Sequence, residues 1–123
     1  MPRVIHFEIG FDNLERVKKF YEKTFNWKFE KWEFEDSEYW LINTGEDPEP
    51  GINGGLFKKQ KNDPTIRNTI DVPNIDEFIK KIKKNGGKMA TPKMPVFGVG
   101  WLAYFYDTEG NMTGIMQSDV NAK

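Results

Sequence analysis

The chain contains no cysteine and only one histidine, His6, among its 123 residues. Without cysteine it has neither a disulfide framework nor a thiolate nucleophile. The cysteine and histidine sets that hold zinc in most proteins are also missing. Any metal or catalytic site would therefore depend on carboxylates, hydroxyl groups and this single imidazole.

The chain also lacks a charge excess and a long apolar run. It has 18 basic and 19 acidic residues, for a net charge of -1, which offers no electrostatic basis for nucleic-acid binding. No apolar stretch approaches membrane length, and the N-terminus lacks a signal-peptide pattern. We expect a soluble cytoplasmic protein with neither a nucleic-acid nor a membrane partner.

Aromatic residues are plentiful, with ten Phe, four Trp and four Tyr. Such a composition suits either a wide core or a pocket in which a ligand stacks against rings. The length suits one compact domain with a sizeable core.

The first segment, residues 4–27, has the pattern of a strand, an amphipathic helix and a second strand. In the first strand, one face is apolar and can pack beneath a helix, while the other face carries His6 and Glu8. Asp12 is predicted to cap the helix, with Glu15 at capping-box spacing. Apolar residues follow at near-helical spacing: Leu14, Val17, Phe20, Tyr21 and Phe25.

A weaker copy of this pattern begins at residue 66. A strand at 66–72 precedes a helix that Asn74 opens and Asn85-Gly86-Gly87 ends. Three further strands are predicted in each copy: 27–34, 38–44 and 52–59 in the first, and 88–91, 101–106 and 112–117 in the second. Residues 35–37 are predicted to turn, and residues 92–100 to form a loop.

The predicted order is therefore strand, helix and three strands, repeated once, which is an α+β fold of two β-α-β-β-β modules. We expect a single domain, 1–123, in which module one spans 3–59 and module two spans 66–118. Residues 60–65 are the predicted linker, and 119–123 the predicted tail.

Several ordered motifs resemble those of the vicinal oxygen chelate superfamily, which includes glyoxalase I, bleomycin-resistance proteins and extradiol dioxygenases. The resemblance covers about residues 3–118, and two motifs are similar to those of a glyoxalase-related bacterial and archaeal subgroup. The matching motifs are Ile5-His6-Phe7-Glu8-Ile9, Asp12-Asn13-Leu14, Phe25-Asn26-Trp27, Gly54-Gly55-Leu56-Phe57, Val72-Pro73-Asn74-Ile75, Asn85-Gly86-Gly87-Lys88 and Phe105-Tyr106-Asp107-Thr108-Glu109-Gly110-Asn111. The resemblance implies that the modules form curled mixed sheets, with the ligand inside, and that the protein is a homodimer.

The resemblance also implies four metal-ligand positions on the concave strand faces, usually filled by His or Glu. In this chain they fall at His6, near Gly55, at about Arg67 and at about Gly114. His6 is the only family ligand that is retained, and glycine has no side chain to offer. We therefore expect no divalent metal and no other cofactor.

His6 and Glu8 remain the candidate catalytic residues, with Arg67 as the predicted partner of Glu8. One interpretation is a structural polar network, because inward carboxylates cost free energy unless they are paired. The other is a clamp for a polar or anionic ligand, in which His6 acts as a base or orients the ligand.

The candidate ligand-binding residues beside Arg67 are aromatic or thioether side chains that suit the wall of a cup. They are Trp40, Phe57, Trp101, Tyr104, Met112 and Met116. Plain core packing is the alternative for the aromatic members, and it is the interpretation chosen for Trp27, Phe29, Phe20 and Phe78. The loop at 92–99 is either a lid over the cup or a dimer contact.

Three functions are consistent with these residues. The favoured hypothesis is a metal-independent small-molecule binding protein of the glyoxalase/bleomycin-resistance type, with an aromatic or amphipathic metabolite as ligand. The alternative is a glyoxalase-related lyase or isomerase acting on a carbonyl substrate. A third is a structural subunit whose cup is filled by its own side chains.

Overall fold

The computed structural model describes residues 1–33 and 38–123, so the turn predicted at 35–37 lies outside the described residues. By contact, the chain divides into two compact units. One unit is residues 6–67, and the other combines residues 1–5 with 68–123. The single-domain assignment stays a prediction.

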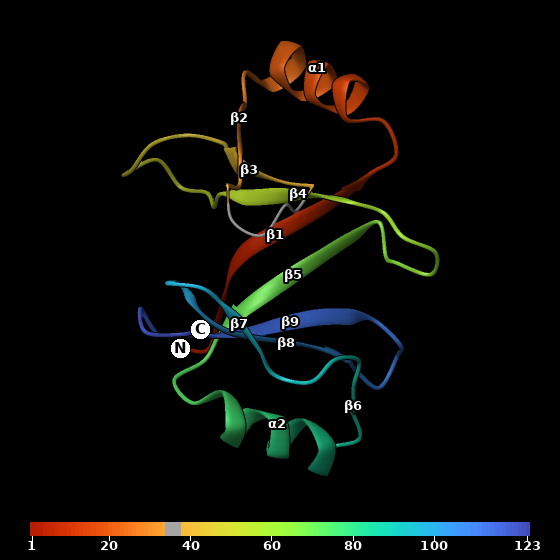
Figure 1. The fold of residues 1–123 in the computed structure, drawn as a ribbon, viewed down its shortest axis with the longest axis vertical. Coiled ribbons are helices and arrows are strands. Elements are labelled where there is room, and N and C mark those ends of the chain that lie inside the picture. The colour runs from red at the N-terminus through yellow and green to blue at the C-terminus, as the bar shows by residue number, and fades with distance from the viewer. Residues whose placement is uncertain (34–37) are drawn as a thin grey trace. The chain divides into compact units, whose positions relative to one another are not determined.

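The elements follow the predicted order of strand, helix and strands, repeated once (Figure 1). The first set is β1 (Arg3–Phe11), α1 (Leu14–Phe25), β2 (Lys28–Lys31), β3 (Tyr39–Asn43) and β4 (Gly54–Lys58). The second set is β5 (Ile66–Asp71), α2 (Ile75–Lys84), β6 (Lys88–Met89), β7 (Met94–Val96), β8 (Gly100–Tyr106) and β9 (Met112–Ser118).

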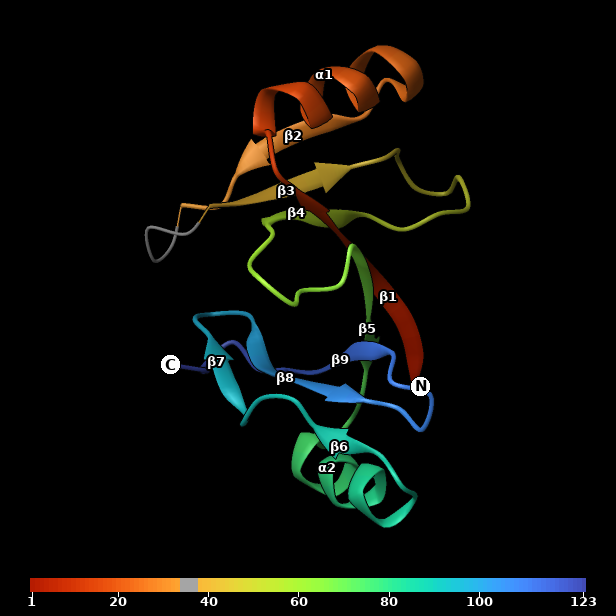
Figure 2. The ribbon, with the colours of Figure 1, turned by 90° about the vertical axis from the view of Figure 1, so that its right-hand side faces the viewer.

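In the unit of residues 6–67, the strands lie in the order β2-β3-β4-β1. The β2–β3 and β3–β4 pairs are antiparallel, while β1 and β4 are parallel, with Phe7 opposite Gly54 and Glu8 opposite Gly55. The chain passes through α1, β2 and β3 between the parallel strands β1 and β4. Helix α1 covers one face of this sheet (Figure 2). The core between them is centred on Phe11, Ile42 and Leu56.

The second unit repeats this topology, with the order β5-β9-β8-β6 and a parallel β5–β9 pair. Its core consists of Val72, Ile75, Ala103 and Ile115, against which the apolar stripe of α2 packs. The predicted loop at 92–100 is partly wrong, because β7 lies within it and pairs with β8. Pro95 is tolerated in β7 because a strand at the margin of a sheet does not need every backbone donor.

Helix α1 begins one residue later than predicted. Asn13, and not Asp12, is its N-cap, and the Asn13 side chain accepts a hydrogen bond from the Arg16 backbone N–H at 3.0 Å. The Asp12 carboxylate instead lies 3.2 Å from Lys59 Nζ. The prediction for α2 is confirmed, because Asn74 caps it and Gly86 follows its end with a φ of 98°.

The apolar stripe of α1 is narrower than its sequence pattern indicates. Leu14 and Val17 pack against the core, but Phe20, predicted to be core, is 56% exposed and meets the ring of Tyr21 edge-on. No helix among the described residues combines the length and apolarity that crossing a bilayer requires.

Candidate functional site

The polar face of β1 places two candidate residues in one unit, on the side away from α1. The ring nitrogen Nε2 of His6 lies 2.8 Å from the Tyr39 hydroxyl. Two residues along, Glu8 Oε1 accepts a hydrogen bond from Arg67 Nε at 2.5 Å, and the side chains of Glu8 and Arg67 are only 6% and 14% exposed. The face therefore carries two polar pairs side by side, of which the His6–Tyr39 pair is partly buried and the Glu8–Arg67 pair is more deeply buried.

Arg67 also contacts an aromatic wall. Its guanidinium carbon lies 4.0 Å from the centroid of the Phe57 ring, a cation–π arrangement. The structure thus brings together Glu8, Arg67 and Phe57, and their predicted roles toward a ligand stay predictions. A planar guanidinium between a carboxylate and a ring is held in one orientation, which suits recognition of a flat or anionic group.

Tyr39 is the residue of this site that the sequence analysis missed. A Cβ atom on Gly55 would lie 2.0 Å from the Tyr39 hydroxyl oxygen, so the phenol occupies the space that a side chain at position 55 would need. The neighbouring candidate Trp40 points the other way, because it packs on the core beside α1 with Lys18 Nζ 4.3 Å from its ring centroid. Strand alternation allows only one of the two on each face.

Burial sets the charge of the imidazole. Desolvation lowers the pKa of His6 below its ordinary value, and the negative charge of Glu8 partly opposes this. His6 is therefore neutral near pH 7, and in the tautomer with its proton on Nδ1, Nε2 accepts a hydrogen bond from the Tyr39 hydroxyl.

This lowered pKa predicts a pH dependence of stability. Between the folded pKa of His6 and the ordinary value of 6.5, the unfolded chain binds more protons, so the free energy of unfolding should fall as pH drops through that interval. One proton limits the slope to about 1.4 kcal/mol per pH unit. Urea unfolding at several pH values should show a shallower dependence in His6→Gln, and parallel curves for both proteins would contradict the assignment.

The second unit separates its four candidates between two faces. Trp101 packs against the core beside α2, and its Nε1 donates to Asp119 Oδ2 at 3.1 Å, which corrects its assignment to the cup wall. Tyr104 lies on the opposite face, where its ring would be 3.0 Å from a Cβ on Gly114. Met112 and Met116 share that face, because Ile115 between them lies in the core.

The four inherited ligand positions do not suit a divalent cation. His6 contacts a phenol, the place of a side chain at Gly55 is taken by that same phenol, and the Arg67 guanidinium would repel a cation. In the other unit, Gly114 lies beneath the ring of Tyr104. The described ranges 1–33 and 38–123 contain no group of three His, Asp or Glu side chains that could hold a metal.

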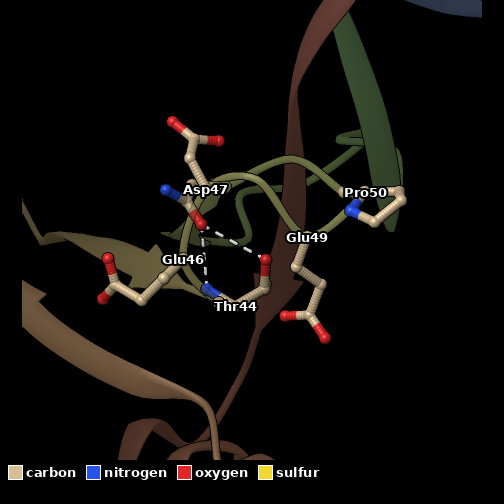
Figure 3. Close-up of a pocket in the computed structure, with 8 residues that line it drawn as sticks. Thr44, Glu46, Asp47, Glu49 and Pro50 are labelled. Carbon is tan, nitrogen blue, oxygen red and sulfur yellow. Dashed lines mark hydrogen bonds between the residues drawn. The ribbon is translucent and has the colours of Figure 1, made fainter.

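Two cavities lie away from these residues. One, of about 70 Å³, is enclosed by the loop after β3, where Asn53 Oδ1 accepts hydrogen bonds from the backbone N–H and the hydroxyl of Thr44 at 2.9 and 3.2 Å. Figure 3 shows the carboxylates of Glu46, Asp47 and Glu49 pointing in different directions, which is unsuitable for a shared cation. The other, of about 450 Å³, lies between α2 and residues 89–93.

Comparison with known proteins gives consistent results. The family model described as the Glyoxalase/Bleomycin resistance protein/Dioxygenase superfamily matches residues 3–115. A glyoxylase-like domain-containing protein of Didymella fabae is 30% identical over 119 residues, covering 88% of each chain.

Two solved structures have the same fold. A hypothetical protein from Bacillus halodurans is 18% identical with a TM-score of 0.70, and covers 98% of this chain and 97% of its own. Methylmalonyl-CoA epimerase from Mycobacterium tuberculosis is 13% identical with a TM-score of 0.71, and covers 94% and 87%. The predicted α+β fold with curled mixed sheets is thereby confirmed.

Proposed function

Because the chain belongs to the glyoxalase/bleomycin resistance protein/dioxygenase superfamily, we propose that it is a metal-independent small-molecule binding protein of the glyoxalase/bleomycin-resistance type. The observation that carries this proposal is the Tyr39 phenol, which covers Gly55 and pairs with His6. Side chains that would contact a metal in such a site instead contact each other.

The chemistry of the site suggests the ligand class. Arg67 and Phe57 form a cationic and aromatic surface, while His6 and Tyr39 offer polar groups beside it. An aromatic or amphipathic metabolite with a carbonyl or carboxylate group would use both parts. We extend the proposal to a homodimer in the cytoplasm, and light scattering of the purified protein tests the dimer.

The proposal is tested by a thermal-shift screen of aromatic and carbonyl metabolites. The shift produced by a ligand should be the same in EDTA and in added nickel, zinc, manganese or iron(II), because binding does not pass through a metal. Arg67→Lys keeps a positive charge beside Glu8 but loses the planar contact with Phe57, and should weaken binding about tenfold. Arg16→Lys, on the exposed surface of α1, is the matched control and should bind normally.

A second candidate function is a lyase or isomerase acting on a carbonyl substrate. It is supported by the buried Glu8–Arg67 pair and by the fold shared with methylmalonyl-CoA epimerase. Glu8 would be the base, and Arg67 would stabilise the enolate-like charge. The same ligands, incubated in D₂O, distinguish the two functions, because only an enzyme would exchange the proton beside the carbonyl, and Glu8→Gln would stop the exchange.

One further experiment could contradict the proposal that ligand binding needs no metal. Calorimetric titration that shows stoichiometric binding of one of those metals, lost in His6→Ala, would overturn it. In that case, ligands outside the inherited positions complete the site around His6.

A further inference from the structure

The unit of residues 1–5 and 68–123 contains a carboxylate oxygen that no hydrogen bond satisfies. Asp71 Oδ1 is buried from solvent and has no hydrogen-bond partner, the one such side-chain atom in the described parts of the chain. A buried polar atom without a partner costs free energy, so a retained one needs an explanation. Nothing in the polar pairs around His6 and Glu8 involves this residue.

The surroundings of Asp71 are apolar. Asp71 stands opposite Met116 in the β5–β9 pair, Met116 stands opposite Leu102 in β9–β8, and Leu102 stands opposite Met94 in β8–β7. Partners in register project to the same face of a sheet, so these four side chains form one row across the sheet.

This row lies on the face turned away from α2. Ile70 and Ile115, which flank Asp71 and Met116 in sequence, pack into the core on the α2 side. Figure 1 shows α2 along that side of the sheet. Met94, Leu102 and Met116 are each partly exposed, so the row offers an apolar surface with a carboxylate at one end.

Within the residues that the structure describes, no cation of this unit forms an ion pair with Asp71. The ion pairs of the unit are Lys93 with Asp76 and Lys81 with Glu77, and both use carboxylates of α2. Two thioethers and a leucine side chain cannot donate a hydrogen bond to a carboxylate. A group that satisfied this carboxylate would donate hydrogen bonds and carry positive charge.

We propose that Asp71 anchors the ammonium group of an amphipathic amine whose apolar body lies along Met116, Leu102 and Met94. A protonated amine supplies both hydrogen-bond donors and the opposite charge, and the flexible methionines can adapt to an aryl or alkyl body. The inference goes beyond the small-molecule function proposed for residues 6–67, because it uses none of their side chains.

The test is calorimetric titration with three probes that share one body and differ at the end: 4-phenylbutylamine, 4-phenylbutan-1-ol and 4-phenylbutanoate, at pH 7. The amine should bind at least tenfold more tightly than the alcohol, and the acid should bind most weakly, because Asp71 repels it. In Asp71→Asn the amine should lose its advantage over the alcohol. Asp76→Asn, which removes an exposed carboxylate on α2 of the same unit, should leave the preference intact.

A second variant separates binding from folding. Asp71→Leu removes the unpartnered oxygen, so the unliganded variant should melt at a higher temperature than the parent protein while losing amine binding. Equal affinity for the three probes, or an amine preference that survives in Asp71→Asn, would overturn the proposal. A lower melting temperature for Asp71→Leu would overturn it as well, because the carboxylate would then be satisfied within the fold. None of these results depends on the site around Arg67.

Discussion

Arg67→Ala is expected to lower the free energy of unfolding by about 3–5 kcal/mol, the largest loss predicted for a single charge in this chain. The Glu8 carboxylate that Arg67 faces is 6% exposed, so it cannot recover its hydration when the guanidinium is removed. The truncation also strips the ring of Phe57 of the cation that lies 4.0 Å from its centroid. Urea unfolding at pH 7, monitored by tryptophan fluorescence, measures the loss.

Two further variants show whether the loss comes from burying one charge. Arg67→Met combined with Glu8→Leu removes both charges and replaces them with apolar groups, so it should cost far less than Arg67→Ala alone. Lys81→Ala breaks an exposed pair, in which Lys81 Nζ lies 3.6 Å from Glu77, and should cost no more than about 0.5 kcal/mol. If the double variant were as unstable as Arg67→Ala, the charge argument would be wrong.

The second large effect is expected at adjacent glycines on opposite faces of β4. A Cβ on Gly54 would lie 2.4 Å from the backbone oxygen of Phe7 and 2.8 Å from its ring, and the backbone of a paired strand cannot move aside cheaply. Gly54→Ala should therefore cost about 3 kcal/mol, at the upper end of what overpacking costs.

Gly55→Ala is the matched control, because its nearest obstacle is the end of one side chain. The ring of Tyr39 has to swing away from the new methyl group, because a Cβ would lie 2.0 Å from its hydroxyl oxygen and 2.3 Å from Cζ, so the loss of stability should be about 1–2 kcal/mol, smaller than for Gly54→Ala. This movement would break the hydrogen bond between the Tyr39 hydroxyl and Nε2 of His6. Thermal unfolding of both variants measures the contrast, and equal losses would show that Tyr39 is as rigid as the backbone.

The order of elements along the chain and the polar face of β1 could be predicted because both follow from simple periods. Alternation in the first strand separates His6 and Glu8 from the apolar residues that meet α1, and the structure retains that division. The apolar spacing of α2 likewise places Ile75 and Phe78 on the core. These patterns are local, and tertiary packing reinforces them.

The residues of the cup wall are harder to predict, because neighbouring residues of a strand point to opposite faces and the sequence does not show which face lines the cup. The rings of Trp40 and Trp101 suit a ligand-binding wall, yet each side chain belongs to the face that meets a helix. Nothing in the sequence around Tyr39 indicates a role for it, because that role depends on the absence of a side chain at Gly55. A ring that fills a space left by a distant glycine cannot be identified from either position alone.

Two further differences between the predicted and the observed elements are the start of α1 and the strand β7. Asp12 and Asn13 are both good cap residues, and the backbone places Asn13 at the start of α1 while Asp12 pairs with Lys59. The sequence does not predict β7, because Pro95 and the nearby glycines favour a loop, and only the pairing with β8 makes this segment a strand.

The division of the chain into units has a consequence for the order of events during synthesis. Residues 6–67 are contiguous, so all their contacts are available once residue 67 has left the ribosome. Residues 1–5 belong with 68–123, and their contacts close a loop that spans the whole of the other unit. Residues 1–5 are therefore made well before residues 68–123, with which they make their contacts, and the unit that contains them should be the slower to form.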